Sequence, residues 1–292
     1  MMNIFDYIIC PVCGGALHRE SKSLICENGH TFDIAKAGYV NLLPPGKEKN
    51  ARTGDEKNMV KARVDFLAKN HYGKISDAAA AMIRKHCGDG FVSCADMGCG
   101  EGYHTCRIAE RLETCVMLGF DASKYAAECA SKLSKSKGMM PREGVGAEHG
   151  SDASAYFFPA NLFRLPVREH SLNAAVSMFA PIAGEESARI LKRGGKLIVV
   201  SSGRDHLLEM RSLIYDEVHF SDPSVAVPEG FRKVDEENLK YTFTLTSRED
   251  IESLFVMTPF YYKTTEKGRE RLLQSDSLTI TAEVNLTVLE VQ

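Results

Sequence analysis

The chain has 292 residues, of which 44% are hydrophobic, and its formal net charge is −3. This length allows one large domain or two smaller ones, and the negative charge argues against wholesale coating of nucleic acid. No apolar run approaches the roughly 20 residues of a membrane span, and residues 1–6 lack the character of a signal peptide. We therefore expect a cytoplasmic protein without a membrane partner, whose nine cysteines serve as metal ligands or core side chains.

The first predicted element is a small metal-binding module. Cys10 and Cys13 form one close pair, and Cys26 and His30 form a second pair after twelve intervening residues. Thiolates and imidazole at such spacing bind Zn²⁺ tetrahedrally. Because four protein ligands fill the coordination shell, we predict one structural zinc that stabilises a segment too small to fold on a hydrophobic core alone. His18 is an alternative ligand with a less suitable spacing.

Charge is unevenly distributed, and the N-terminal part of the chain is the basic part. Residues 1–85 hold 13 Lys and Arg against 9 Asp and Glu. Between Lys47 and Arg63, six basic residues face three acids. Such a surface can meet phosphates, although a merely solvated charged stretch accounts for the pattern equally well.

Two helices are predicted next, at 55–69 and at the alanine-rich residues 76–86, with Asp55 or Thr53 as the cap of the first. From residue 92 onward, apolar strands alternate with helices, which is typical of a parallel sheet with crossover helices. The predicted strands are 92–97, 115–120, 155–159, 172–179 and 196–201, and the predicted helices are 103–112, 123–136, 185–191 and 205–218.

The C-terminal part is predicted to complete this sheet. Residues 241–245 and 278–291 form two further strands, and a helix lies between them because Ser247 and Asp250 fit a capping box. Residues 137–153 are rich in glycine and charge and are predicted to be a surface loop. The whole pattern therefore predicts seven strands with a terminal hairpin.

The most informative motif is the glycine turn after the strand 92–97. Asp96 lies at the end of this strand, and Gly98, Gly100 and Gly102 follow at every second position. Such glycines let the backbone turn tightly and approach a nucleotide-like ligand. Dinucleotide-binding turns space their glycines as G-x-G-x-x-G, which makes NAD a distant second choice. A second acid, Asp121, ends the next strand, where carboxylates bind ribose hydroxyls.

This turn resembles motif I of the class I S-adenosylmethionine (SAM) methyltransferases. In that class, the acid of the motif helps to hold the positively charged amino-acid end of the cofactor. The resemblance implies an α/β chain with the class I SAM-dependent methyltransferase fold, a Rossmann-like seven-stranded sheet preceded here by a small N-terminal zinc-binding domain. SAM is the cofactor that we expect, together with one structural zinc.

Further segments carry a more specific resemblance. They are the Cys10, Cys13, Cys26 and His30 cluster and residues 32–43, 54–55, 62–67, 71–72, 96–103, 180–181, 204–207, 213–215 and 257–260. These segments are similar to the bacterial 23S ribosomal RNA (guanine-N1)-methyltransferases, a family that includes enzymes conferring resistance to tylosin-type macrolides. The resemblance implies methyl transfer from SAM to N1 of a guanine in a hairpin loop of 23S rRNA.

The resemblance also implies functional residues. It places zinc at the four residues derived above and SAM contacts at Tyr72, Gly100, Glu101 and His206. The general methyltransferase fold adds further cofactor contacts at Asp96, Gly98, Gly102, Asp121, Asn161 and Leu162. Residues 1–43 would form the zinc-binding domain that recognises rRNA, 44–90 a linker with helices that cover the cofactor, and 91–292 the methyltransferase domain. A homodimer is compatible with the family.

The reaction itself suggests a few candidates. Guanine N1 carries a proton at neutral pH, so a base must accept it, and N1 lies on the Watson–Crick edge, so the target must be unpaired. Phe179 is a candidate for stacking on the base or, equally, a core side chain, and Glu185 and Glu209 are candidate bases that could also be ordinary surface acids. Tyr39 and Asn41 are candidates for RNA contact. The alternatives are a small-molecule SAM methyltransferase and a non-catalytic RNA-binding protein with a methyltransferase fold.

Overall fold

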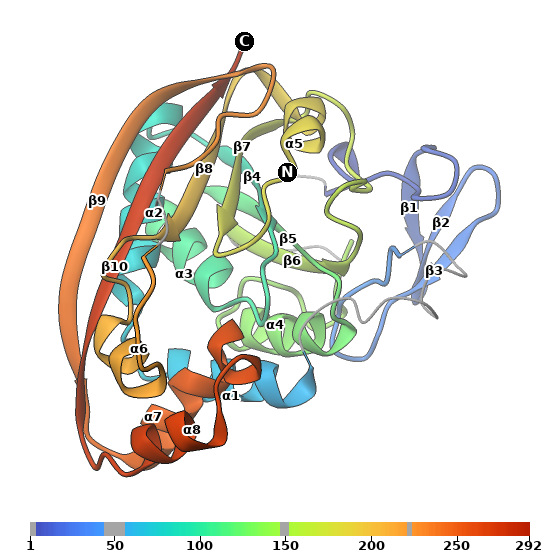
Figure 1. The fold of residues 1–292 in the computed structure, drawn as a ribbon. Helices are drawn as coiled ribbons and strands as arrows, with labels where there is room; N and C mark the ends of the chain where they lie inside the picture. Colours follow the sequence, from blue (N-terminus) through green and yellow to red (C-terminus); the bar gives the residue numbers. More distant parts are fainter. Residues whose placement is uncertain (1–3, 44–55, 147–151, 221–223) are drawn as a thin grey trace.

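A seven-stranded sheet forms the centre of the structure, and a small three-stranded sheet lies beside it (Figure 1). The computed structural model describes residues 4–43, 56–146, 152–220 and 224–292. The strand order of the large sheet is β6, β5, β4, β7, β8, β10, β9. These strands are β4 (Val92–Met97), β5 (Cys115–Asp121), β6 (Ala153–Pro159), β7 (Leu172–Met178), β8 (Leu191–Ser202), β9 (Phe231–Leu245) and β10 (Leu278–Val291).

Helices connect and flank these strands in the order in which the chain meets them. They are α1 (Lys57–Leu67), α2 (Gly73–Cys87), α3 (Tyr103–Leu112), α4 (Lys124–Ser136), α5 (Gly184–Ile190), α6 (Leu208–Ile214), α7 (Arg248–Val256) and α8 (Glu266–Leu273), with short 3-10 turns η1 (Ile4–Asp6) and η2 (Pro259–Tyr262). Ser123 and Ser247 cap α4 and α7, because each side-chain oxygen accepts a backbone N–H three residues ahead. The described helices include none that is long and apolar enough to cross a membrane.

The inner strands are parallel and buried. β4 pairs in parallel with β5 and β7, and β5 and β7 pair in parallel with β6 and β8. All six residues of β4 are buried, as expected for a parallel strand that is covered on both faces. Because parallel strands end at the same edge, the turns after β4, β5, β6 and β7 converge there. The predicted fold class is thereby confirmed.

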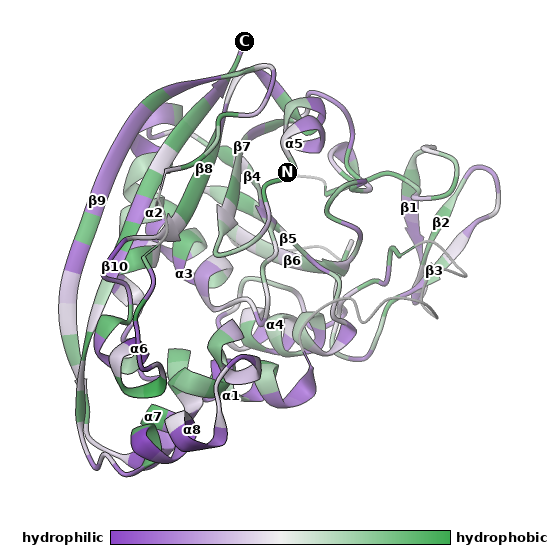
Figure 2. Ribbon diagram, in the orientation of Figure 1, coloured by the Kyte–Doolittle hydropathy of each residue, from purple (hydrophilic) through white to green (hydrophobic). Residues whose placement is uncertain are grey.

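The C-terminal hairpin completes the sheet in the antiparallel sense. β10 lies between β8 and β9 and is antiparallel to both. β9 starts at Phe231, ten residues earlier than predicted, and is the edge strand of the sheet. Its charged first half obscured the strand pattern in the sequence, and Figure 2 shows this hydrophilic stretch along the outside of the sheet. Charged side chains on an edge strand discourage pairing with other chains.

The N-terminal module contains three short antiparallel strands, β1 (Leu17–Glu20), β2 (Ser23–Cys26) and β3 (Thr31–Asp33). It docks on the large domain through backbone hydrogen bonds. The N–H of Ile9 donates to the carbonyl of Pro166 at 3.0 Å, and that of Leu42 donates to the carbonyl of Pro159 at 2.9 Å. These bonds fix the module beside the ends of β6 and the chain that follows it.

The segment 137–153, predicted to be a surface loop, is partly buried in the structure. Met139, Met140 and Val145 are buried, and residues 147–151 lie outside the described part of the chain. The Arg19 guanidinium of β1 donates to the carbonyl of Val145 at 2.8 Å and to those of the two residues before it. The described part of this segment is therefore a docking surface for the N-terminal module.

Several boundaries differ from the prediction. The helix predicted at 205–218 is restricted to α6, because Tyr215 already has extended backbone angles. β8 begins at Leu191, directly after α5, whereas the strand was predicted to begin at residue 196. α8 was not predicted at all. The caps Asp55 and Thr53 lie outside the described residues, and the described helix α1 begins at Lys57.

Candidate functional site

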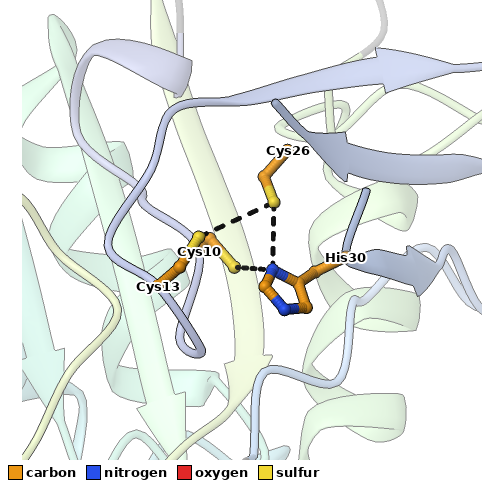
Figure 3. A group of neighbouring side chains, drawn as sticks. All are labelled: Cys10, Cys13, Cys26 and His30. Carbon is orange, nitrogen blue, oxygen red and sulfur yellow. Dashed lines mark hydrogen bonds between the residues drawn. The ribbon is translucent and has the colours of Figure 1, made fainter. Parts of the chain in front are cut away.

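Four ligand atoms converge in the N-terminal module, as Figure 3 shows. The donor atoms of Cys10, Cys13, Cys26 and His30 all lie within 4.8 Å of one another. The Cys13 and Cys26 sulfurs are 3.8 Å apart, and His30 Nδ1 lies 3.3 Å from the Cys26 sulfur. Sulfurs about 2.3 Å from a shared tetrahedral zinc lie about 3.8 Å from each other. The donor set and its geometry therefore fit one zinc ion.

The local backbone explains how the four donors meet. Gly14 and Gly29 have φ of +73° and +78°, which side chains with a Cβ rarely adopt, and each lies in the tight turn that follows a ligand. The N–H of Gly14 donates to the carbonyl of Cys10, and that of Gly29 donates to the carbonyl of Cys26. His18 lies exposed on β1, outside the cluster, so the structure removes it as an alternative ligand.

A large cleft of about 2340 Å³ opens at the carboxyl ends of the parallel strands. The glycine turn after β4 lines its floor, and the zinc module contributes Pro11 and Val12 to its wall. Most of the predicted cofactor contacts line this cleft. They are Tyr72, Gly98, Gly100, Glu101, Asp121, Asn161, Leu162 and His206.

The three glycines of the turn have different duties. Gly98 has φ +92°, and an added Cβ would lie 2.6 Å from the Cβ of Ala180. Gly100 has φ +54°, and its N–H donates to the Asp121 carboxylate at 3.0 Å. Gly102 lies away from the cleft, where a Cβ would lie 2.7 Å from the Cβ of Ala130 in α4. The third glycine therefore serves helix packing.

The acids of the motif also differ. Asp96 is buried and does not line the cleft, and its carboxylate accepts a hydrogen bond from the Thr105 hydroxyl at 2.5 Å. Burial raises the pKa of Asp96 to about 6. Asp121 accepts backbone N–H groups from Gly100 and Ser123 and lines the cleft. Asp121 is therefore the acid of this pair that faces the cleft, whereas Asp96 lies buried behind the turn and bonds to Thr105.

Glu101 is a buried acid of the cleft with one carboxylate oxygen that no protein group satisfies. Its side chain is 4% exposed, it lines the cleft, and its Oε2 has no hydrogen-bond partner. Burial raises the pKa of Glu101 to about 7, although Arg63 opposes this shift. A buried carboxylate oxygen without a donor is costly. The site therefore fits a cofactor that brings a cationic donor group, as the amino-acid end of SAM does.

Three aromatic side chains that line the cleft, Tyr72, Phe179 and His206, contact one another. The Tyr72 hydroxyl lies 3.2 Å from His206 Nε2, and His206 Nδ1 accepts the N–H of Glu283. Nδ1 therefore carries no proton, so Nε2–H donates to Tyr72. Burial lowers the pKa of His206 to about 4, which keeps the imidazole neutral. The ring of Phe179 stacks on His206 with centroids 5.6 Å apart.

The candidates for catalysis separate clearly in the structure. Phe179 lines the cleft, is 42% exposed and has φ +54°, so it is no ordinary core side chain. Glu185 is exposed in the first turn of α5 and does not line the cleft. Both carboxylate oxygens of Glu209 accept hydrogen bonds from Thr281, also away from the cleft. We therefore do not retain Glu185 and Glu209 as bases.

Sequence reasoning missed several residues of the cleft. His104, in the first turn of α3, lines it and accepts or donates a 2.8 Å hydrogen bond with Ser76. Burial lowers the pKa of His104 to about 3. Arg63 of α1 and Phe163, which follows Asn161, also line the cleft. The sequence offered two signals: His104 lies one residue after the start of the helix that follows the motif, and Arg63 lies in the segment 62–67 that carries the family resemblance.

Comparison with known protein families identifies two parts of the chain. Residues 8–52 match the family model described as "RlmA, N-terminal", a zinc ribbon. Residues 95–199 match the model described as "Methyltransferase domain". These two matches cover the four converging donors and the glycine turn, respectively.

Three curated relatives align with much of the chain. A 23S rRNA (guanine(748)-N(1))-methyltransferase of Streptomyces fradiae is 35% identical over 71% of this chain and 68% of the relative. A putative 23S rRNA (guanine-N(1)-)-methyltransferase of Micromonospora griseorubida is 32% identical over 71% of this chain and 70% of the relative. A putative enzyme of the same description from Bacillus subtilis (strain 168) is 29% identical over 97% of each chain.

Proposed function

The chain belongs to the family of 23S rRNA (guanine-N1)-methyltransferases, and from this premise we propose that it transfers the methyl group of SAM to N1 of a guanine in a 23S rRNA hairpin loop. One observation carries the proposal: a single cleft is lined by the glycine turn, by the exposed ring of Phe179 and by Pro11 and Val12 of the zinc module. Cofactor, target base and RNA can meet in this space.

Cofactor binding is assigned to the part of the cleft that the glycine turn lines. When bound, SAM supplies an electrophilic methyl group, so the protein needs to orient the nucleophile and exclude water. Gly98 and Gly100 line the cleft, and we assign Asp121, which also lines it and accepts the N–H of Gly100, to the ribose hydroxyls of the cofactor. Tyr72 and the neutral His206 are buried and hydrogen-bonded to each other, so they offer the cofactor polar contacts without adding a charge to the site.

The target guanine is expected beside Phe179. Its N1 must leave any Watson–Crick pair before it can be methylated, and an aromatic ring can stack on a base that is turned out of a hairpin. The ring of Phe179 is exposed at the carboxyl end of β7 and forms part of the cleft. It is therefore the side chain that we assign to stacking on the guanine.

The rim of the cleft suits single-stranded RNA. Phe163 is 64% exposed, and its N–H is held by the Asn161 side chain in a tight turn. Basic side chains also line the cleft and can contact phosphates. They include Arg164, Arg204, Arg211 and Lys263. Aromatic platforms and cations of this kind bind unpaired nucleotides by stacking and charge.

We assign a separate role in this reaction to each of three parts of the chain. Residues 1–43, with zinc held by Cys10, Cys13, Cys26 and His30, recognise rRNA. Residues 44–90 supply helices that cover the cofactor, and residues 91–292 carry the methyltransferase chemistry. In support, Val12 of the module and Arg63 and Tyr72 of the intervening segment line one cleft together with the glycine turn.

The proposal is tested with the full chain, labelled SAM and 23S rRNA. We expect label in the RNA and none in a panel of small apolar acceptors such as quinones. Label in the small molecules but not in the RNA would favour a small-molecule methyltransferase. Binding of SAM without label in any acceptor would point to a non-catalytic RNA-binding protein and contradict the proposal.

A further inference from the structure

One buried carboxylate and one guanidinium face each other across the floor of the cleft. Glu101 Oε2 has no hydrogen-bond partner, although its side chain is 96% buried, and Arg63 Nη1 lies 3.9 Å away. This separation exceeds the 2.7–3.2 Å of an N–H···O hydrogen bond. The two groups attract each other through charge without satisfying each other's hydrogen bonds.

Arg63 is positioned by two helices that lie outside the parallel sheet, α1 and α7. It belongs to α1, which packs against α7 in the lower part of Figure 1. Its Nη2 donates to the carbonyl of Met257, which follows α7, at 3.4 Å. Its Nη1 lies 3.3 Å from the position that a Cβ of Gly100 would occupy. The guanidinium therefore covers the glycine turn and lines the cleft at the same time.

We propose that Arg63 and Glu101 form a paired clamp for the zwitterionic amino-acid end of SAM, in which Arg63 binds the carboxylate and Glu101 binds the ammonium group. The inference rests on the proposed function, because it assumes SAM as the ligand. It goes beyond the proposed function by assigning Arg63 to the carboxylate of SAM. A guanidinium matches a carboxylate in geometry and can donate two hydrogen bonds to it. An ammonium supplies the donor that Glu101 Oε2 lacks.

The arrangement also explains why both groups are needed. A carboxylate ligand alone would leave Glu101 unpartnered and would add negative charge beside it, and an ammonium alone would lie beside the positive charge of Arg63. Only a ligand that carries both charged groups on one carbon atom, as an amino acid does, satisfies the two residues together. The clamp would therefore distinguish ligands by their amino-acid end, and it would couple α1 to the glycine turn when the cofactor binds.

The experiment compares two ligands that share the adenosine part. S-adenosylhomocysteine carries the ammonium and the carboxylate, whereas 5′-methylthioadenosine lacks both. Affinities are measured by titration calorimetry for the wild-type chain, for Arg63→Gln and for Lys61→Gln. The last variant removes the same charge from an exposed position of α1 that does not line the cleft, so it serves as the matched control.

We expect Arg63→Gln to lower the affinity for S-adenosylhomocysteine about 10- to 100-fold, because a charge-assisted hydrogen-bonded contact is lost. The affinity for 5′-methylthioadenosine should stay within about twofold of the wild-type value. Lys61→Gln should change neither affinity. Equal weakening of both ligands by Arg63→Gln, or no weakening of either, would overturn the clamp.

Two further measurements keep the outcome specific. If Arg63→Gln fails to fold, Arg63→Lys keeps the charge but loses the fork, and it should weaken S-adenosylhomocysteine more than 5′-methylthioadenosine. Equal affinities for Arg63→Lys and the wild-type chain would then contradict the assignment. A wild-type chain that binds neither ligand would instead refute the proposed function itself.

Discussion

Replacement of Phe179 by glycine separates stability from function. Phe179 follows β7 with φ +54°, and its N–H donates to the carbonyl of Val200 at 2.9 Å, which holds the backbone in this conformation. The ring is 42% exposed, and it contacts the rings of His206, Tyr72 and His104, at centroid distances of 5.6, 6.2 and 6.5 Å. A large side chain is thus kept in a left-handed, half-exposed position inside a cleft.

The expected change in stability is small because two effects oppose each other. A fully buried phenylalanine contributes about 1.5–3 kcal/mol, and at 42% exposure the contribution of Phe179 falls to about 1–2 kcal/mol. A non-glycine residue in the left-handed region costs about 1–2 kcal/mol, which glycine recovers. Phe179→Gly should therefore change the free energy of unfolding by no more than about 1 kcal/mol.

The expected change in RNA binding is larger. Stacking of a base on an aromatic ring is worth about 1–3 kcal/mol, so Phe179→Gly should weaken RNA binding about 5- to 150-fold. The assay is filter binding of a 23S rRNA fragment, with urea unfolding as the measure of stability. Phe91→Gly is the matched control, because Phe91 is 40% exposed and does not line the cleft. Unchanged RNA affinity in Phe179→Gly, or equal losses in both variants, would refute the reasoning.

Three further predictions concern the zinc module and the cofactor. Cys26→Ser should release zinc and abolish RNA methylation while S-adenosylhomocysteine affinity stays within about threefold, as metal analysis and calorimetry can show; full RNA methylation without zinc would contradict it. Asp121→Ala should weaken S-adenosylhomocysteine and 5′-methylthioadenosine alike, because both carry the ribose; unequal losses in calorimetry would place Asp121 elsewhere. Burial and the nearby Asp121 raise the pKa of Glu101 to about 7, while Arg63 opposes this shift. Below pH 7 the carboxyl is therefore protonated, and the affinity for S-adenosylhomocysteine should fall up to about tenfold per pH unit. Calorimetry from pH 7 to 5.5 should find the affinity for 5′-methylthioadenosine unchanged, and an equal fall for both ligands would exclude Glu101 as the cause.

Local patterns predicted the parallel sheet well. The strand Val92–Met97 and the helix Tyr103–Leu112 have the predicted bounds, because an apolar run, a glycine turn and an amphipathic segment follow one another without ambiguity. The capping serine at 247 also lies where the sequence placed it. These features depend on neighbours in the chain, and such dependence is visible in a single sequence.

Features that depend on distant parts of the chain were not predictable in the same way. The segment 137–146 is rich in glycine and charge, yet its carbonyls accept hydrogen bonds from Arg19, more than one hundred residues away. Composition indicates exposure, but it does not reveal that a second module covers the segment. The early start of β9 was missed for a related reason, since charged residues suit an edge strand as well as a loop.

The acids of the cleft illustrate the same limit. Asp96 and Glu101 belong to one short motif, and the sequence alone favoured Asp96 as the partner of a cationic ligand. The structure buries Asp96 against Thr105 and aims Glu101 into the cleft. Which side chain of a tight turn faces the ligand depends on backbone angles, and which cation lies opposite depends on the packing of α1. The position of Arg63 opposite Glu101 therefore became visible only in three dimensions.

The identity of the methylated atom tests the central claim most directly. 23S rRNA is incubated with the full chain and SAM, digested to nucleosides, and the methylated nucleoside is identified by mass spectrometry against standards. In parallel, reverse transcription maps the position, since a methyl group at N1 blocks Watson–Crick pairing. The account predicts N1-methylguanosine and one strong stop in a hairpin loop. A methyl group on another atom or base, or RNA that stays unmethylated while the protein binds SAM, would contradict it.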